Sequence, residues 1–409
     1  MSDYLIGCSK RIVKSWALLI AFGILFSLAT PRPVCSQCFL GRVDAFSEQI
    51  QSSDLVVLAE FVCAVKPIDP KSAGTSTLVV RRVLKGPLDF VYADQIVQLD
   101  YAATFLTGES VFLLGQTKGT GFEWWTMLPF SNCRQGYLDR IKEHESSPEK
   151  RLRYFLPYLE STDFLADLDA ENEFTVANYT DLIDLTPEFP RMKLRQWIRN
   201  PHTSPRRLGV YGVMLGMCGQ PVDAKLLHEM IFDHLNHENF VLGLDGLLAG
   251  YLLVHGERGL AEIDSKILQD RSGSFSRTFA VMQAIRFLKD CHIDRIPMPR
   301  LRDSMRLLLD RQDFADLVVV DLARMQDWEI QDRLTRQYGK NLFTEPASKR
   351  AIIRFLMACS QQTLDVQSPP PEAVASAGRA VKNLEFLRRQ DPEMVRNTER
   401  FFMEQKLLE

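Results

Sequence analysis

Two segments in the C-terminal part of the chain repeat one another. Residues 208–216 (LGVYGVMLG) match residues 242–250 (LGLDGLLAG) at an offset of 34 in the numbering, and each segment carries three glycines. Glycine inside a helix costs about 1 kcal/mol relative to alanine, so three in one helix require a compensating gain. Spacings of three and then four positions put the glycines on one stripe, where a neighbouring helix can approach closely. We therefore predict stacked helices that pack along Gly209, Gly212, Gly216, Gly243, Gly246 and Gly250.

The repeat continues for another period. Ala280 and Ala284 occupy the places of Gly246 and Gly250 one further repeat length along the chain. A period of 34 is typical of solenoids built from helical pairs. The Trp, Tyr and Pro positions of the tetratricopeptide pattern are absent, and the region resembles irregular HEAT-like repeats. The resemblance implies an α-solenoid over residues 148–367.

Helix signals dominate the chain from Ser147 onward. Ser147-Pro148 and Ser204-Pro205 each place a capping side chain before a proline at the first helical position. Residues 301–310 carry their apolar side chains on one helical face. Residues 317–320 (LVVV) are locally ambiguous between helix and strand. Residues 368–371 (SPPP) are predicted to be a linker before a final helical pair at 372–409.

The region before this helical part has a different pattern. Residues 39–52 show helical spacing, and residues 39–140 as a whole predict one small β-domain, either a barrel or a sandwich. Short stretches rich in Val, Phe and Trp alternate there with turns that contain Gly, Pro and Asp. The predicted strands are residues 55–65, 77–84, 94–99, 110–114 and 122–127. The expected fold class is therefore α+β and mainly α, with an N-terminal barrel followed by the solenoid.

Residues 1–29 predict a signal peptide. Lys10, Arg11 and Lys14 precede the apolar run 16–29, which is shorter than the roughly 20 residues of a membrane span. Ser27 and Ala29 fit the small-residue positions of a cleavage site. We expect an exported protein, periplasmic or secreted, with a Cys-rich segment at residues 30–38. The alternative is an uncleaved N-terminal membrane anchor.

Four of the eight cysteines fall in the segment and the β-domain that follow the predicted signal peptide. They are Cys35, Cys38, Cys63 and Cys133. In an exported β-domain this number favours two disulfides over a zinc site, which would need a second close pair. We expect Cys35 and Cys38 to bridge to Cys63 and Cys133 in either order, and a direct bridge between Cys35 and Cys38 is disfavoured.

The order of features in this region resembles the netrin-type OB-fold domain of tissue inhibitors of metalloproteinases. The resemblance rests on the Cys pair, the short helix, residues 53–60 (SDLVVLAE), residues 79–86 (VVRRVLKG) and the late Cys133. It implies an OB-like barrel, with peptidase inhibition as an alternative function. Those inhibitors begin with Cys-x-Cys and chelate zinc through the first cysteine, whereas this chain has Cys-x-x-Cys.

Candidate catalytic groups are few. His228, His234 and His237 form a histidine cluster, but position 232 is Phe, so the His-Glu-x-x-His motif of zinc peptidases fails. His234 and His237 can share a helix face and are the weak metal-ligand candidates. Asp245 and Asp321 are expected to be structural carboxylates.

The overall charge argues against one class of partner. The chain has 49 basic and 52 acidic residues, a formal charge of −3, which offers no basic excess for nucleic acid. We expect no cofactor and a protein partner, with a membrane involved only if the signal stays uncleaved. The predicted function is a non-enzymatic exported scaffold that binds protein through the solenoid. The alternatives are a peptidase inhibitor and, last, a metal-dependent hydrolase.

Overall fold

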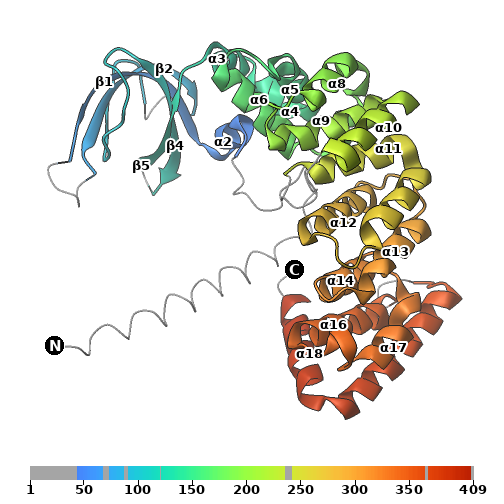
Figure 1. Ribbon diagram of the computed structural model, residues 1–409. Helices are drawn as coiled ribbons and strands as arrows, with labels where there is room; N and C mark the ends of the chain where they lie inside the picture. Colours follow the sequence, from blue (N-terminus) through green and yellow to red (C-terminus); the bar gives the residue numbers. More distant parts are fainter. Residues whose placement is uncertain are drawn as a thin grey trace, which may run out of the picture. The chain divides into compact units, whose positions relative to one another are not determined.

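The N-terminal part of the computed structural model is a curled antiparallel sheet (Figure 1). The structure describes residues 44–67, 73–86, 91–119, 121–234, 242–363 and 367–406. The predicted signal peptide (1–29) and the Cys-rich segment (30–38) lie outside these residues. A short helix, α2 (Phe46–Ser52), precedes the sheet and covers the second half of the predicted helix at 39–52.

All five predicted strands are confirmed. They run antiparallel in the order β3-β2-β1-β4-β5. Four of them, β3-β2-β1-β4, have the strand order of a Greek key. Because β3 and β5 are the two edges, the sheet is a half-barrel and not the closed barrel that the pattern allowed. The strands are β1 (Leu55–Val65), β2 (Thr75–Lys85), β3 (Ile96–Leu99), β4 (Ser110–Lys118) and β5 (Gly121–Pro129).

Both faces of the sheet are apolar, and they belong to different cores. Val57, Ala59 and Phe61 of β1 point into a core inside the curl. Val56 of β1 and Phe112 of β4 point the other way, into a core shared with the helices. This alternation follows from the two-residue period of a strand. The sheet therefore lies between its own small core and the helical part.

Helices begin earlier than the sequence predicted. Ser131 caps α3 by accepting a hydrogen bond from the Arg134 amide at 3.1 Å, well before the predicted start at Ser147. The predicted caps at Ser147 and Ser204 are both present. Their hydroxyl oxygens accept hydrogen bonds from backbone amides at 3.3 and 3.4 Å, respectively. The helices up to this second cap are α3 (Asn132–Leu138), α4 (Ile141–Ser146), α5 (Pro148–Phe155), α6 (Phe164–Val176), α7 (Tyr179–Ile183) and α8 (Arg191–Arg199).

The rest of the described chain is helical and includes two π-helical turns, η3 and η4. Residues 317–320, ambiguous in sequence, are part of helix α14. A left-handed Gly256, with φ of 61°, divides α11 into two helical segments. The elements are α9 (Pro205–Cys218), α10 (Pro221–His228), η3 (Glu229–His234), α11 (Leu244–Ile263), η4 (Asp264–Leu268), α12 (Phe275–Asp290), α13 (Met298–Arg306), η5 (Leu307–Asp310), α14 (Ala315–Arg324), η6 (Trp328–Ile330), α15 (Gln331–Gln337), η7 (Asn341–Phe343), α16 (Pro346–Gln361), α17 (Pro371–Gln390) and α18 (Pro392–Lys406).

The repeated glycine segments meet face to face. A Cβ atom built on Gly212 would lie 2.7 Å from the carbonyl oxygen of Gly246, and one on Gly216 would lie 2.5 Å from Cα of Gly250. A Cβ on Gly246 or Gly250 would clash with the carbonyl oxygen of Gly209 or Gly212. Contacts that advance together along both helices mean that α9 and α11 run parallel, backbone against backbone.

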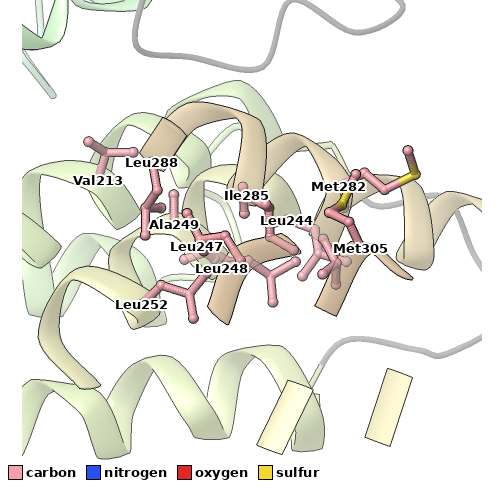
Figure 2. Packing of buried hydrophobic residues seen from close by; sticks show 14 of the residues in the cluster. Val213, Leu244, Leu247, Leu248, Ala249, Leu252, Met282, Ile285, Leu288 and Met305 are labelled. Carbon is pink, nitrogen blue, oxygen red and sulfur yellow. The ribbon is translucent and has the colours of Figure 1, made fainter. Parts of the chain in front are cut away.

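Apolar side chains continue this packing beyond the glycines. Figure 2 shows Val213 of α9 together with side chains of α11, such as Leu247, and of α12, such as Ile285. Met305 of α13 belongs to the same core. Successive helices thus share one continuous hydrophobic core. Within the described part of the chain, no helix has the length and apolar character to cross a membrane.

Candidate functional site

Helix α6 carries buried polar side chains on several sides. An ordinary surface helix has one apolar stripe and one polar face, whereas α6 buries polar groups that must find partners inside the protein. These residues are Asp169, Glu171, Asn172, Glu173 and Thr175. Their partners come from elements on both sides of α6 in the sequence.

One side of α6 holds the N-terminal elements. Glu173 accepts hydrogen bonds from the Ser47 amide at 2.8 Å and from its hydroxyl at 2.7 Å, and pairs with Arg151 at 3.2 Å. Complete burial raises the pKa of Glu173 to about 7, against the opposing effect of Arg151 and Ser47. Asp169 receives two hydrogen bonds from Arg134, at 2.8 and 2.9 Å, and burial still raises its pKa. These hydrogen bonds and ion pairs therefore join helices α2, α3 and α5 to α6.

The other side of α6 holds the first repeat helix. Arg207 of α9 donates to Glu171 and to Asp167, both at 2.6 Å. It also lies 3.3 Å from Glu160, which accepts a hydrogen bond from Tyr211 at 2.8 Å. Burial, followed by the negative charge of Glu160, raises the pKa of Tyr211. Helix α6 is thus a polar junction between the sheet region and the repeats.

Hydrogen-bonded pairs of basic and acidic side chains recur along the helical part at a similar separation in the sequence. Each joins residues separated by 34 to 36 positions, close to the period of the sequence repeat. Each pair thereby joins two elements that lie about this distance apart along the chain. The pairs are Arg134 with Asp169, Arg207 with Glu171, His228 with Glu262, Arg300 with Asp264, and Arg286 with Asp321.

Of the three histidines in the cluster, His228 is the one whose side chain the structure describes. His228 Nε2 lies 3.0 Å from Glu262, which also receives a hydrogen bond from Tyr251 at 2.6 Å and an ion pair from Lys266 at 2.8 Å. Burial opposes ionisation of Glu262, but these three donors outweigh it and lower the pKa to about 2. His228 therefore contacts α11 through Glu262, and it also lies 4.0 Å from Asp233 of η3.

The weak metal candidates cannot be placed at a site. His237 and the side chain of His234 lie outside the described part of the structure. Among the residues that the structure does describe, no group of three or more His, Cys, Asp or Glu side chains could hold a metal ion.

The two singled-out aspartates differ in environment. Asp321 is 2% exposed and receives hydrogen bonds from Arg286 at 2.8 and 2.6 Å, as a structural carboxylate would. Burial raises the pKa of Asp245 to about 6, although its own amide and that of Gly246 partly offset this. Asp245 lies in the first turn of α11, where backbone amides favour a carboxylate.

Two of the four cysteines predicted to form disulfides lie in the described part of the structure. Cys63 is an exposed thiol on β1, and Cys133 is a buried thiol on α3 whose pKa burial raises to about 12. Cys35 and Cys38 lie outside the described residues, so the disulfide pairing stays a prediction. Of the remaining cysteines, Cys359 is buried and Cys218 and Cys291 are half-buried.

The polar junction at α6 was not found from the sequence. The pattern that could have indicated it is DLDAENE, residues 167–173, in which acidic residues occupy every second position. A helix with one solvated face would instead have its acidic residues at helical spacing on that face. Their partners Ser47 and Arg207 are far away in the chain, so sequence spacing does not predict these contacts. Comparison with known proteins found no matching family model, no matching curated protein and no matching solved structure.

Proposed function

We propose that this protein is an exported, non-enzymatic scaffold that binds a protein partner through the surface of its helical part. The observation that carries this proposal is the backbone contact between α9 and α11 at their opposed glycines. Helices packed this closely and tied by ion pairs make a rigid support for an extended binding surface.

The finer fold assignments belong to the same proposal. We infer a HEAT-like solenoid from the parallel packing of the repeated helices and from ion pairs spaced by about one repeat. We infer an OB-like origin for the sheet, since an OB-fold is a partly open Greek-key barrel of five strands. The order β3-β2-β1-β4-β5 supports this inference.

The contacts of Glu262 and Asp321 are those of structural carboxylates. A general base works best with a pKa near the working pH, but the pKa of Glu262 is held near 2 by its three donors. Asp321 accepts a hydrogen bond from Arg286 and also lies 3.6 Å from the guanidinium of Arg324. Both carboxylates serve to join neighbouring elements.

The test compares apolar surface positions on the helices with matched positions on the sheet. Met192 (65% exposed) and Val222 (55%) lie on helices α8 and α10. Ile96 (66%) and Leu106 (77%) lie on β3 and in the loop before β4. Each pair is replaced by arginine in the full chain. A partner is first isolated by crosslinking in the exported fraction, purified, and then titrated calorimetrically against each variant.

We expect the helix variant to weaken binding and the sheet variant to bind like the parent protein. The reverse result would favour the inhibitor-like alternative that acts through the sheet. Turnover of a substrate by the purified protein, without any binding partner, would contradict the scaffold proposal. Point variants are used because removal of residues 148–409 would also uncover the apolar face of the sheet that the helices bury.

A further inference from the structure

A depression lies between α15 and α17, close to the C-terminal end of the helical part. Its volume is about 320 Å³. The residues that line it are Asp332, Thr335, Arg336, Tyr338, Lys340, Asn383, Phe386 and Gln390.

The floor and one wall are fixed by internal hydrogen bonds. Tyr338 is 1% exposed, and its hydroxyl donates to Asp391 at 3.2 Å, an acceptor that it shares with Lys349. Asn383 of α17 donates to Asp332 of α15 at 2.9 Å and closes one side. These groups have their partners within the protein and hold the two helices at a set separation.

Two cations at the same depression have no such partner. Within the described part of the chain, the side chains of Arg336 and Lys340 make no hydrogen bond and no ion pair. With Asp332 as the single acidic lining residue, already bonded to Asn383, the lining has a net charge of +1. Phe386 forms an apolar part of the lining, and because this residue is 55% exposed its ring is open to contact with a ligand.

We propose that this depression binds an acidic segment of the partner protein, with a carboxylate between Arg336 and Lys340 and a neighbouring apolar side chain against Phe386. Arginine and lysine both bind carboxylates, and arginine can do so through two parallel hydrogen bonds. A protein segment fits better than a free anion, because it supplies an apolar side chain for the exposed ring. This inference rests on the proposed function and names the chemistry of its partner.

The test uses the full chain and a fluorescent synthetic peptide in which Glu alternates with Phe and Leu. We expect saturable binding by anisotropy, and a loss of affinity of about tenfold in the R336A/K340A double variant. The matched control is K66A/R271A, which removes two exposed cations away from α8, α10 and the depression and should leave the affinity unchanged. Phe386→Ala should weaken binding of the peptide without changing the response to salt.

Four results would overturn the proposal. A peptide with Gln in place of Glu that binds equally well would show that the carboxylates are not recognised. Inorganic phosphate that displaces the peptide fully at equal concentration would assign the site to small anions. Equal binding by the parent protein and R336A/K340A would place the peptide elsewhere. If an isolated partner still binds the double variant unchanged, this site is refuted while the scaffold function stands.

Discussion

Glu173 is a fully buried carboxylate at the contact between α2 and α6. Its two oxygens accept hydrogen bonds from Ser47, 126 residues away in the chain, and Arg151 lies beside them. Burial outweighs these favourable contacts and raises the pKa from 4.5 to about 7. The carboxyl group of Glu173 is therefore protonated in the folded protein below a pH of about 7.

This shift predicts a pH dependence with a definite sign. Because the folded pKa is the higher one, the stabilising contribution is complete below about pH 4.5 and is lost as the pH rises through about 7. We expect Glu173→Gln to remove this dependence. Relative to the variant, the parent protein should lose about 2 kcal/mol of unfolding free energy between pH 5 and 8, measured by urea denaturation. Parallel profiles for both proteins would contradict the assignment.

His144 is a buried imidazole whose pKa shift gives the opposite dependence of stability on pH. It is 3% exposed and stacks on Tyr137 with ring centroids 4.9 Å apart. Neither ring nitrogen has a hydrogen-bond partner among the described residues. Burial, followed by the positive charge of Arg140, lowers the pKa of His144, and Arg151 and Lys150 act in the same direction against Glu143.

We therefore expect acid to destabilise the protein through His144. A lowered folded pKa means that the stabilising contribution is present above the unfolded value of 6.5 and is lost as the pH falls below it. His144→Phe keeps an aromatic ring beside Tyr137 and removes the titrating group. The variant should lose less unfolding free energy than the parent between pH 7 and 5. His202→Gln, at an exposed position, is the control and should follow the parent.

At the scale of helices, the opposed glycines of α9 and α11 leave no room for a side chain. Gly250→Ala places a methyl group against the carbonyl oxygen of Gly212, so the two helices must move apart. We expect a net loss of about 1–3 kcal/mol in unfolding free energy, because overpacking outweighs the gain in helix propensity. Chemical denaturation measures this change.

The control for this substitution lies in α17. A Cβ at Gly378 would meet no atom within 4 Å, so Gly378→Ala brings only the propensity gain and should stabilise by up to about 1 kcal/mol. Losses of equal size at both positions would show that close approach is not what Gly250 provides.

Local patterns predicted the elements well and the connections between them poorly. The apolar residues of β1 and the cap at Ser147 are short-range signals, and both strand and helix lie where they predict. Helices α3 and α4 were missed because Ser131 is followed by Asn and Cys, without the proline that marks Ser147. The meeting of the glycine segments followed from their spacing, but their parallel direction did not.

Across the whole molecule, one core links the sheet to the helices. Val56, Phe112 and Leu114 on the outer face of the sheet are 0% exposed and belong to the core that continues to Val395 of α18. The candidate sites are built in the same way, from residues far apart in sequence, such as Arg336 with Phe386 or Ser47 with Glu173. Sequence spacing within one element cannot predict such pairs.

Truncation tests this linkage. A fragment of residues 44–131 keeps the strands but loses α3 to α6, so the apolar outer face becomes exposed to water. We expect it to aggregate or to give a poorly dispersed NMR spectrum, since each large apolar side chain contributes about 1.5–3 kcal/mol when buried. A fragment of residues 44–199 keeps the contacts of Glu173 and Asp169 and should retain dispersed strand resonances. Equal dispersion in both would show that the sheet folds alone.

The 126-residue separation of Ser47 from Glu173 also has a consequence for biosynthesis. At about 5–20 residues per second, α6 leaves the ribosome roughly 6–25 s after α2. During that interval the strands have been synthesised, but the apolar residues of the outer face still lack the helices that bury them in the folded protein. A nascent chain of this protein therefore passes through a stage at which a chaperone has apolar strand residues to hold, and that stage ends when α6 arrives.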